Sequence, residues 1–259
     1  MYDMQTRTRV LTLVGQGLSL NAVSKQTGVS RAAIRSWQTR PEPRPRLSAQ
    51  TAPCFRCAPL PAQPQDPAAY AYLLGLYLGD GCISPQKRGY SLRIFCADAW
   101  PGLIALCREA VRAVRPANGV WITQRQGCVE VGSYDRHWPC LFPQHGPGKK
   151  YERRIVLEEW QQLIMDAHPW EFIRGLVHSD GCRITNWTTR AVAGVRKRYE
   201  YPRYFFTNRS ADVLRLYTDT LDRVGVEWKS CNQSRSVENI SVARRASVAL
   251  MDARVGPKC

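Results

Sequence analysis

One sequence pattern occurs twice in this chain and limits the folds that it can adopt. Residues 72–81, YLLGLYLGDG, form an apolar segment that ends in Asp80 and Gly81, and residues 172–181, FIRGLVHSDG, repeat the pattern a hundred positions later. Each segment is predicted to be a helix that ends at its Asp-Gly pair. An internal repeat of this kind predicts two similar halves related by a pseudo-two-fold axis.

A similar order of elements follows each Asp-Gly pair. In the first half the sequence predicts a strand over 90–98, a helix over 101–114 and two strands around a turn at 126–127. In the second half it predicts a strand over 201–210, a helix over 211–225, strands over 225–230 and 239–245, and a helix over 246–252. We therefore predict an α+β fold in which each half is a small antiparallel sheet with helices on one face.

Proline divides the chain into two unequal parts. Eight of the 17 prolines lie between residues 38 and 67. Because proline excludes helix interiors and central strands, this stretch is predicted to be a semi-extended linker. The predicted organisation is a small all-α domain over 1–38, a linker over 39–67 and a body over 68–259, with repeats over about 68–168 and 169–256.

The N-terminal segment has the pattern of three short helices. Ser19 and Ser30 are candidate N-caps of the second and third helices, and Gly28 supplies the turn between them. The segment resembles the helix-turn-helix of resolvases and transposases. Arg31 and Arg35 lie four residues apart, so both project from one exposed face of the third helix, which could enter a DNA major groove. A plain three-helix unit with solvated arginines is the alternative.

Charge and composition favour nucleic acid as the partner. The formal net charge is +16, which predicts a polyanionic partner, and 44% apolar residues suffice for a folded core. No run of eighteen apolar residues occurs, so no membrane segment is predicted. Most of the ten cysteines are interpreted as reduced core residues, and the expected location is the cytoplasm, at the nucleoid when bound to DNA.

Two of the cysteines have a spacing that metal sites use. Cys54 and Cys57 form a CxxC pair, which is half of a zinc site. No second CxxC or HxxxH follows, so a closed site would need ligands from distant positions in the chain. The pair is therefore either part of a zinc site or two ordinary thiols.

The repeated segments also resemble a known family. GLYLGDG (75–81) and GLVHSDG (175–181) resemble the signature helix of LAGLIDADG homing endonucleases, and two copies match the single-chain, two-repeat form of that family. The resemblance covers roughly residues 70–256 and implies two curved sheets that form a saddle over the DNA major groove. It also implies metal-dependent cleavage of phosphodiester bonds by Asp80 and Asp180. Leu78 and His178 depart from the pattern, because each replaces the first acid of the motif.

Spacing on the two helices suggests how they meet. Gly75 and Gly79 lie four residues apart, as do Gly175 and Ser179, so each helix presents a stripe of small residues that permits close packing. That contact would bring the two helix C-termini together, with the carboxylates of Asp80 and Asp180 and the last carbonyl groups, those of Gly79 and Ser179, around one position. Carboxylates, carbonyls and water suit Mg²⁺ or Mn²⁺.

Basic residues complete the predicted site. The candidates for DNA contact in the body are Arg190, Arg196, Lys197, Arg198, Arg203 and Arg209, and a second basic cluster consists of Lys149, Lys150, Arg153 and Arg154. Lys229, on a predicted strand, is the candidate for the basic residue that the family carries near the cleavage site.

Three functions remain open at this stage. A metal-dependent, site-specific double-strand DNA endonuclease is favoured by the retention of both Asp80 and Asp180. A DNA-binding transcription regulator without cleavage is favoured by the helix-turn-helix. An accessory protein for RNA processing is the third. Because both repeats lie in one chain, we expect a monomer.

Overall fold

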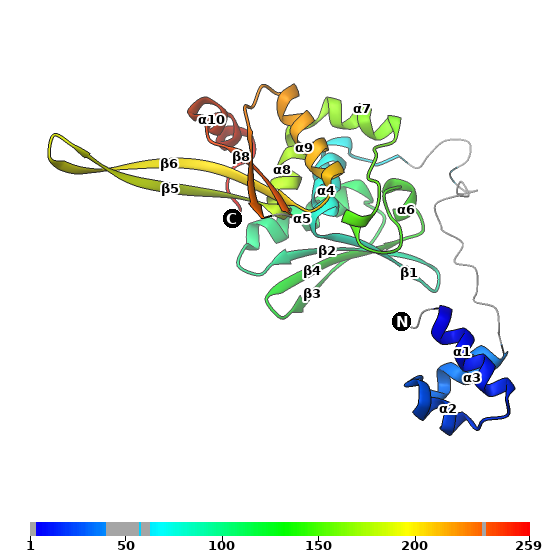
Figure 1. Ribbon diagram of the computed structural model, residues 1–259. Helices are drawn as coiled ribbons and strands as arrows, with labels where there is room; N and C mark the ends of the chain where they lie inside the picture. The colour runs from blue at the N-terminus through cyan, green and yellow to red at the C-terminus, as the bar shows by residue number, and fades with distance from the viewer. Residues whose placement is uncertain (1–3, 40–56, 58–62, 235–236) are drawn as a thin grey trace. The chain divides into compact units, whose positions relative to one another are not determined.

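The computed structural model describes residues 4–39, 57, 63–234 and 237–259 (Figure 1). By its internal contacts the chain divides into two compact units, Met1–Ala49 and Gln50–Cys259. Most of the predicted linker over 39–67, including Cys54, lies outside the described residues. Among the described residues, no helix combines the length and the hydrophobicity that a membrane crossing requires.

Three helices make up the first unit: α1 (Met4–Gly15), α2 (Leu20–Thr27) and α3 (Arg31–Thr39). The side chains of Ser19 and Ser30 accept hydrogen bonds from the backbone amides of Ala22 and Ala33, which caps α2 and α3. Gly28 has a φ of 70° and ends α2 in the left-handed region. The core consists of the buried residues Val10, Val23, Val29 and Ile34.

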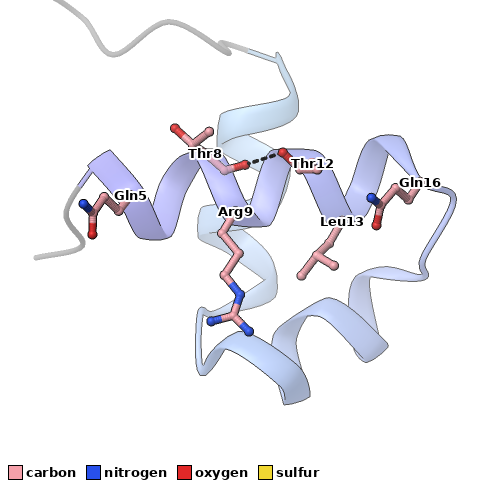
Figure 2. Close-up of a pocket in the computed structure, with 6 residues that line it drawn as sticks. All are labelled: Gln5, Thr8, Arg9, Thr12, Leu13 and Gln16. Atoms are coloured by element: carbon pink, nitrogen blue, oxygen red, sulfur yellow. Dashed lines mark hydrogen bonds between the residues drawn. The ribbon is translucent and has the colours of Figure 1, made fainter.

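One exposed face of α1 carries a shallow polar depression. Figure 2 shows Gln5, Thr8, Arg9, Thr12, Leu13 and Gln16 along this helix. The Thr12 hydroxyl donates to the Thr8 carbonyl at 3.0 Å, which is a bond within one helix. Because a single helix supplies all six side chains, the depression has no opposing wall, and we assign it no role.

The second unit is built from two four-stranded antiparallel sheets and the helices that cover them. Their strand orders are β1-β2-β4-β3 and β5-β6-β8-β7, so the second half repeats the topology of the first. The elements in chain order are α4 (Pro67–Asp80), β1 (Gly81–Gln86), β2 (Gly89–Ala97), α5 (Pro101–Val114), β3 (Val120–Arg125), β4 (Cys128–Asp135), α6 (Trp138–Leu141), the 3-10 turn η1 (Lys150–Glu152), α7 (Glu159–Ala167), α8 (Pro169–Asp180), β5 (Gly181–Val192), β6 (Val195–Asn208), α9 (Ala211–Arg223), β7 (Lys229–Ser234), β8 (Val237–Val242) and α10 (Arg245–Arg254). The predicted duplicated α+β fold is confirmed.

The sequence patterns missed the strand that opens each sheet. β1 and β5 begin at Gly81 and Gly181, directly after the helices, where we predicted no strand. β1 contains Pro85, and β5 is polar along most of its length, so neither shows the alternation of a half-buried strand. Both lie at the edge of their sheet, where proline and polar residues are tolerated.

Strand register shows which positions of the two sheets correspond. Trp121 lies opposite Gly132, and Lys229 lies opposite Ser241 at the matching position of the second sheet. The counterpart of Trp121 is therefore Lys229.

Helices α4 and α8 lie side by side at the centre of the unit and join the two halves (Figure 1). Every residue of α4 from Tyr70 to Leu78 is buried, because the helix is enclosed by protein on all sides. A Cβ atom at Gly75 would lie 2.6 Å from the backbone nitrogen of Leu176, and one at Gly175 would collide with the Tyr72 carbonyl. The two backbones thus touch, and we call this contact the seam.

Glycine is also required where each helix passes into its strand. A Cβ atom at Gly81 would lie 2.5 Å from the Cα atom of Tyr77, and one at Gly181 would lie 2.7 Å from that of Val177. Both residues have extended backbone and open a strand, so the chain turns sharply against the end of the helix. Asp80 and Asp180 are held at these two junctions.

The seam predicts an unusual response to alanine. In a helix, Gly→Ala ordinarily stabilises by about 1 kcal/mol. Gly75→Ala should instead destabilise the protein by about 1–3 kcal/mol, because its Cβ meets backbone atoms that cannot rotate away. Urea unfolding monitored by circular dichroism measures this difference. Gly119→Ala is the control, since nothing lies within 4 Å of a Cβ there; equal stability of both variants would contradict a backbone contact.

Candidate functional site

The seam brings Asp80 and Asp180 to one place. A Cβ atom on Gly79 would collide with the Ser179 side chain and lie 2.9 Å from an Asp180 carboxylate oxygen. Asp80 is exposed at the open end of the seam, and Asp180 is half-buried. The two residues end the signature helices of the two halves, so each half contributes one carboxylate.

Both carboxyl groups are less acidic than an ordinary aspartate. Desolvation by the surrounding protein, and then the negative charge of Asp180, raise the pKa of Asp80 to about 6. Desolvation also raises the pKa of Asp180, although a hydrogen bond from Asn208 and the charges of Lys150 and Lys258 oppose the shift. The protein therefore disfavours the ionised form of both carboxyl groups when no cation is bound.

Two lysines converge on the ends of the same helices. The Lys150 ammonium donates to the carbonyl oxygens of Tyr77 and Gly79, both at 2.5 Å, and of Gly81 at 2.9 Å. The Lys258 ammonium donates to the Ser179 carbonyl at 2.8 Å. Each lysine thus binds the negative end of one helix dipole, at the helix that carries one of the aspartates.

Burial weakens the basicity of these lysines. It lowers the pKa of Lys150 to about 8, against the opposing effect of the two aspartates, and it also lowers the pKa of Lys258. Lys150 lies in η1, after the first sheet and α6, and Lys258 lies after the second sheet and α10, so the two occupy similar places 108 residues apart. They form a pair that matches the pair of aspartates.

The carbonyl groups of Gly79 and Ser179 differ from our expectation. The sequence suggested that these oxygens face a metal ion. In the structure they are acceptors of the two lysine ammonium groups, and the Ser179 hydroxyl donates to the Leu176 carbonyl at 2.9 Å. A cation at this place could still bind the oxygens of the two carboxylates. The carbonyl oxygens of Gly79 and Ser179 each keep a second lone pair that could also bind it.

The surroundings of the two aspartates are not equivalent. Asn208, at the end of β6, donates to the Asp180 carboxylate at 2.7 Å, and its own oxygen accepts from the backbone amide of Ser210 at 2.8 Å. Strand register gives Cys96 the corresponding position in the first half. A buried thiol there is a weak donor, so the ionised form is better stabilised at Asp180 than at Asp80.

Lys229, predicted as a catalytic residue, is not brought to the aspartates. It begins β7, which is three strand spacings from β5 across the second sheet, and Asp180 directly precedes β5. With strands about 4.8 Å apart, this is a separation of about 14 Å. Lys150 and Lys258 occupy the place near the carboxylates, because the ends of the repeats fold back to the seam.

The face of the first sheet that points away from its buried side chains is basic and aromatic. A depression there is lined by Gln86, Ser91, Arg93, Trp121, Thr123, Arg125, Glu130 and Tyr134. Trp121 stacks on Tyr134 with ring centroids 4.2 Å apart, and Arg125 pairs with Glu130 at 2.8 Å. Trp121, Arg93 and Arg125 were not among the predicted contact residues, because only the strand register shows that they share a face.

A long two-stranded ribbon extends from the second sheet (Figure 1). β5 and β6 pair from Gly181 to the turn at Ala193 and Gly194, but β8 joins β6 only over Tyr204–Asn208. Beyond the sheet both faces of the ribbon meet solvent, and Trp187, at 59% exposure, projects from it. The positive φ angles of 50° and 77° at the turn fit a tight hairpin.

The predicted basic residues of this region fall on opposite faces of the ribbon. By alternation along β6, Arg203 and Lys197 share the face opposite the buried Tyr204, and Arg190 is the register partner of Lys197. Arg196 and Arg198 lie on the other face. There Arg198 pairs with Glu200 at 2.9 Å and stacks on Trp187.

The remaining basic candidates are divided between the two units. Arg209 lies over the Tyr151 ring at 4.2 Å and lines a depression with Lys149, Lys150 and Asp180, next to the seam. In the first unit Arg31 and Arg35 are exposed on α3, and Arg31 donates to Asn21 of α2 at 3.0 Å.

Comparisons with known proteins give distant likenesses in structure alone. No protein-family model matches the chain, and no curated protein matches it. Among solved structures, it is similar to the homing endonuclease I-DmoI in a complex with DNA and Mn, with a TM-score of 0.49 and 15% identity over 74% of this chain and 99% of that one.

Two further structures show a similar degree of likeness. The LAGLIDADG meganuclease I-AabMI bound to uncleaved DNA has a TM-score of 0.46 and 13% identity, over 73% of this chain and 82% of that one. The N-terminal LAGLIDADG domain of DUF199/WhiA has a TM-score of 0.46 and 10% identity, over 74% of this chain and 83% of that one. Because these sequence identities are low, the likeness extends to the fold alone, and the chemistry of the site depends on this chain's own residues.

The position of Lys150 predicts a stability difference from its neighbour. Lys150→Met should lower the melting temperature, because three carbonyl oxygens lose their donor and the carboxylates lose a positive charge, at a cost of about 1–3 kcal/mol. Lys149→Met is the control, since that side chain is 66% exposed and its replacement should leave the melting temperature nearly unchanged. Calorimetry of both variants without divalent metal measures the two melting temperatures. Equal values would show that Lys150 does not stabilise the ends of the helices.

Proposed function

We propose that this protein binds double-stranded DNA and hydrolyses its phosphodiester bonds at Asp80 and Asp180 with a divalent metal ion. The observation that carries the proposal is the seam, which places one aspartate from each half at the same position and raises the pKa of both. A structural role alone gives no reason to hold two like charges together at the negative ends of two helices.

The side chains at the seam fit a hard divalent cation. Asp80 and Asp180 supply carboxylate oxygens, which Mg²⁺ and Mn²⁺ prefer, and Asp80 is open to solvent and therefore to a DNA phosphate. Desolvation, the largest cause of the raised pKa of both carboxyl groups, disfavours their ionised forms, and a bound cation would favour them. Such a cation would supply an activated water and would stabilise the leaving oxygen.

The chain's own residues orient and balance this pair. Asn208 holds the Asp180 carboxylate by donating to one of its oxygens, and this fixes the direction of the other. Lys150 and Lys258 keep positive charge near the reacting phosphate. Lys150 directs three hydrogen bonds to backbone carbonyls, whereas Lys258 directs one to the Ser179 carbonyl. Arg209, exposed beside the same depression, is placed to contact the DNA backbone.

The two sheets offer a surface for the duplex. The depression on the first sheet combines arginines with a stacked aromatic pair, and the ribbon carries Arg190 and Lys197 directly opposite each other. Like charges at paired positions destabilise a sheet, and a bound polyanion would relieve that repulsion. Because both halves lie in one chain, a single copy can supply both sides of the site, and we propose that the protein acts as a monomer.

We propose that α3 of the first unit makes a separate DNA contact through Arg31 and Arg35. Both side chains are exposed near the N-terminal end of a capped helix that follows a tight turn. This geometry suits insertion into a major groove. The sequence, the charge and the caps support the proposal. An Arg31→Ala/Arg35→Ala variant should bind a selected duplex more weakly and with a smaller slope of log affinity against log salt, and unchanged affinity and slope would contradict it.

One observation favours a second function, that of a DNA-binding regulator without cleavage. Lys150 and Lys258 already bind the helix carbonyls and lie near both carboxylates. If the two lysines alone balance the charge of the carboxylates, the aspartates need no metal ion, and the fold serves only to bind DNA. The two functions differ in one outcome, which is whether bound DNA is cut.

Cleavage assays on Asp→Asn variants separate these functions. Duplexes that the protein retains are first selected from a randomised library and then incubated with Mg²⁺ or Mn²⁺. Asp80→Asn and Asp180→Asn should each abolish cutting and leave DNA affinity within a few-fold of wild type, because the sheets carry binding. Each variant should melt at or slightly above the wild-type temperature without metal at neutral pH, since a carboxyl group with a raised pKa destabilises the fold when it is ionised.

The decisive control is the wild-type protein itself. Tight retention of a selected duplex that is never nicked in either metal would establish the regulator. Variants that melt far below wild type would assign both aspartates a structural role.

The ribbon allows a matched test of the DNA surface. Arg190→Gln/Lys197→Gln and Arg196→Gln/Arg198→Gln each remove two charges, from opposite faces of the same strands. If the face continuous with Arg203 meets the duplex, the first variant should reduce the slope of log affinity against log salt by about two units, one per lost phosphate contact. The second should change it much less, because Arg198 is already paired with Glu200. Equal slopes for both variants would show that net charge alone matters.

A further inference from the structure

At the start of helix α6, Cys57 meets His137 and Cys140, which follow it in the chain by about 80 residues. The metal-binding atoms of Cys57, His137 and Cys140 all lie within 4.8 Å of one another. The Cys57 sulfur is 3.0 Å from Nδ1 of His137, and the Cys140 sulfur is 3.9 Å from the same nitrogen. Cys57 belongs to the CxxC pair, which lacked a partner in the sequence.

These distances match the edges of a tetrahedral zinc site. With Zn–S bonds of about 2.3 Å and Zn–N bonds of about 2.0–2.1 Å, a sulfur and a nitrogen ligand lie about 3.5 Å apart. The two observed separations, 3.0 and 3.9 Å, fall on either side of this value. Small movements of the side chains would therefore place all three at bonding distance from one ion.

The protein holds two of the ligands in place before any ion binds. His137 and Cys140 are three residues apart on one helical turn, and the Cys140 amide donates to the His137 carbonyl at 2.9 Å. The His137 amide donates to the Asp135 carboxylate at 2.8 Å, and Arg115 anchors that carboxylate in turn. Preorganised ligands lose little conformational freedom when the metal binds.

We propose that Cys57, His137 and Cys140 bind a zinc ion. Cys54, the other member of the CxxC pair, lies outside the described residues. Thiolate and imidazole ligands select zinc, whereas the carboxylates at the seam suit Mg²⁺, so the two sites take different metals.

The ion would tie the chain that precedes α4 to α6. It closes a loop of about 80 residues between Cys57 and His137, and a cross-link over a loop of that length restricts the unfolded chain strongly. α6 is well anchored, because Trp138 is completely buried and its indole donates to the Ser133 carbonyl at 3.0 Å. The proposed zinc therefore fixes residue 57 against the core of the second unit.

Metal analysis of the full chain tests the proposal. Protein purified without chelators and without a histidine tag should contain one zinc per chain by mass spectrometry. Co²⁺ exchanged for the zinc should show the strong visible bands of tetrahedral coordination and a thiolate charge-transfer band in the near ultraviolet. A chelator that removes the metal should lower the melting temperature. These measurements use the wild-type protein and do not depend on whether variants fold.

Variants then assign the ligands. Cys57→Ser, His137→Ala and Cys140→Ser should each reduce bound zinc at least tenfold. Cys231→Ser, at an exposed thiol elsewhere, should retain the full content. Asp80→Asn should also retain it, which separates this proposal from the nuclease. Zinc-free wild-type protein, a disulfide between Cys54 and Cys57 in its place, or zinc content unchanged in the ligand variants would overturn the proposal.

Discussion

The structure depends on the backbone contact between α4 and α8. Gly75 and Gly175 allow the two helices to approach until main-chain atoms meet, and no larger residue fits at either position. Because this contact lies at the pseudo-two-fold axis, it fixes the orientation of each sheet relative to the other. It also fixes the distance between the two helix C-termini, so the position of the candidate site follows directly from the packing of the core.

Electrostatics at the seam explains why the site requires so many partners. The C-terminal ends of two helices and two carboxylates all carry negative charge toward the same place. Lys150 and Lys258 supply positive charge from the end of each repeat, and Asn208 supports only Asp180. The duplication thus provides two similar half-sites, and Asn208 in one half with Cys96 in the other makes them unequal. A divalent cation at the open end, beside Asp80, would complete the balance of charge.

The sequence predicted the parts of the molecule that depend on local or periodic signals. The two signature helices, the duplicated order of elements and the capped helices of the first unit all follow from spacing and turn residues. It did not predict β5, because a ribbon with two solvent-exposed faces shows no alternation. Nor did it place Lys150, Lys258 or the partners of Cys57, because tertiary folding alone brings these residues to their sites. Strand order, which sequence does not reveal, puts Lys229 at the edge of the second sheet opposite β5, and its catalytic role stays a prediction.

The central claim is that the seam holds a divalent metal ion between the two halves. Crystals of the protein with a selected duplex and Mn²⁺ would test it through the anomalous scattering of the metal. We expect an anomalous peak within bonding distance of carboxylate oxygens of both Asp80 and Asp180, next to a DNA phosphate, and its loss in Asp180→Asn crystals. Bound DNA without a peak at the seam, and with the ammonium groups of Lys150 and Lys258 as the only cations beside the carboxylates, would contradict the account.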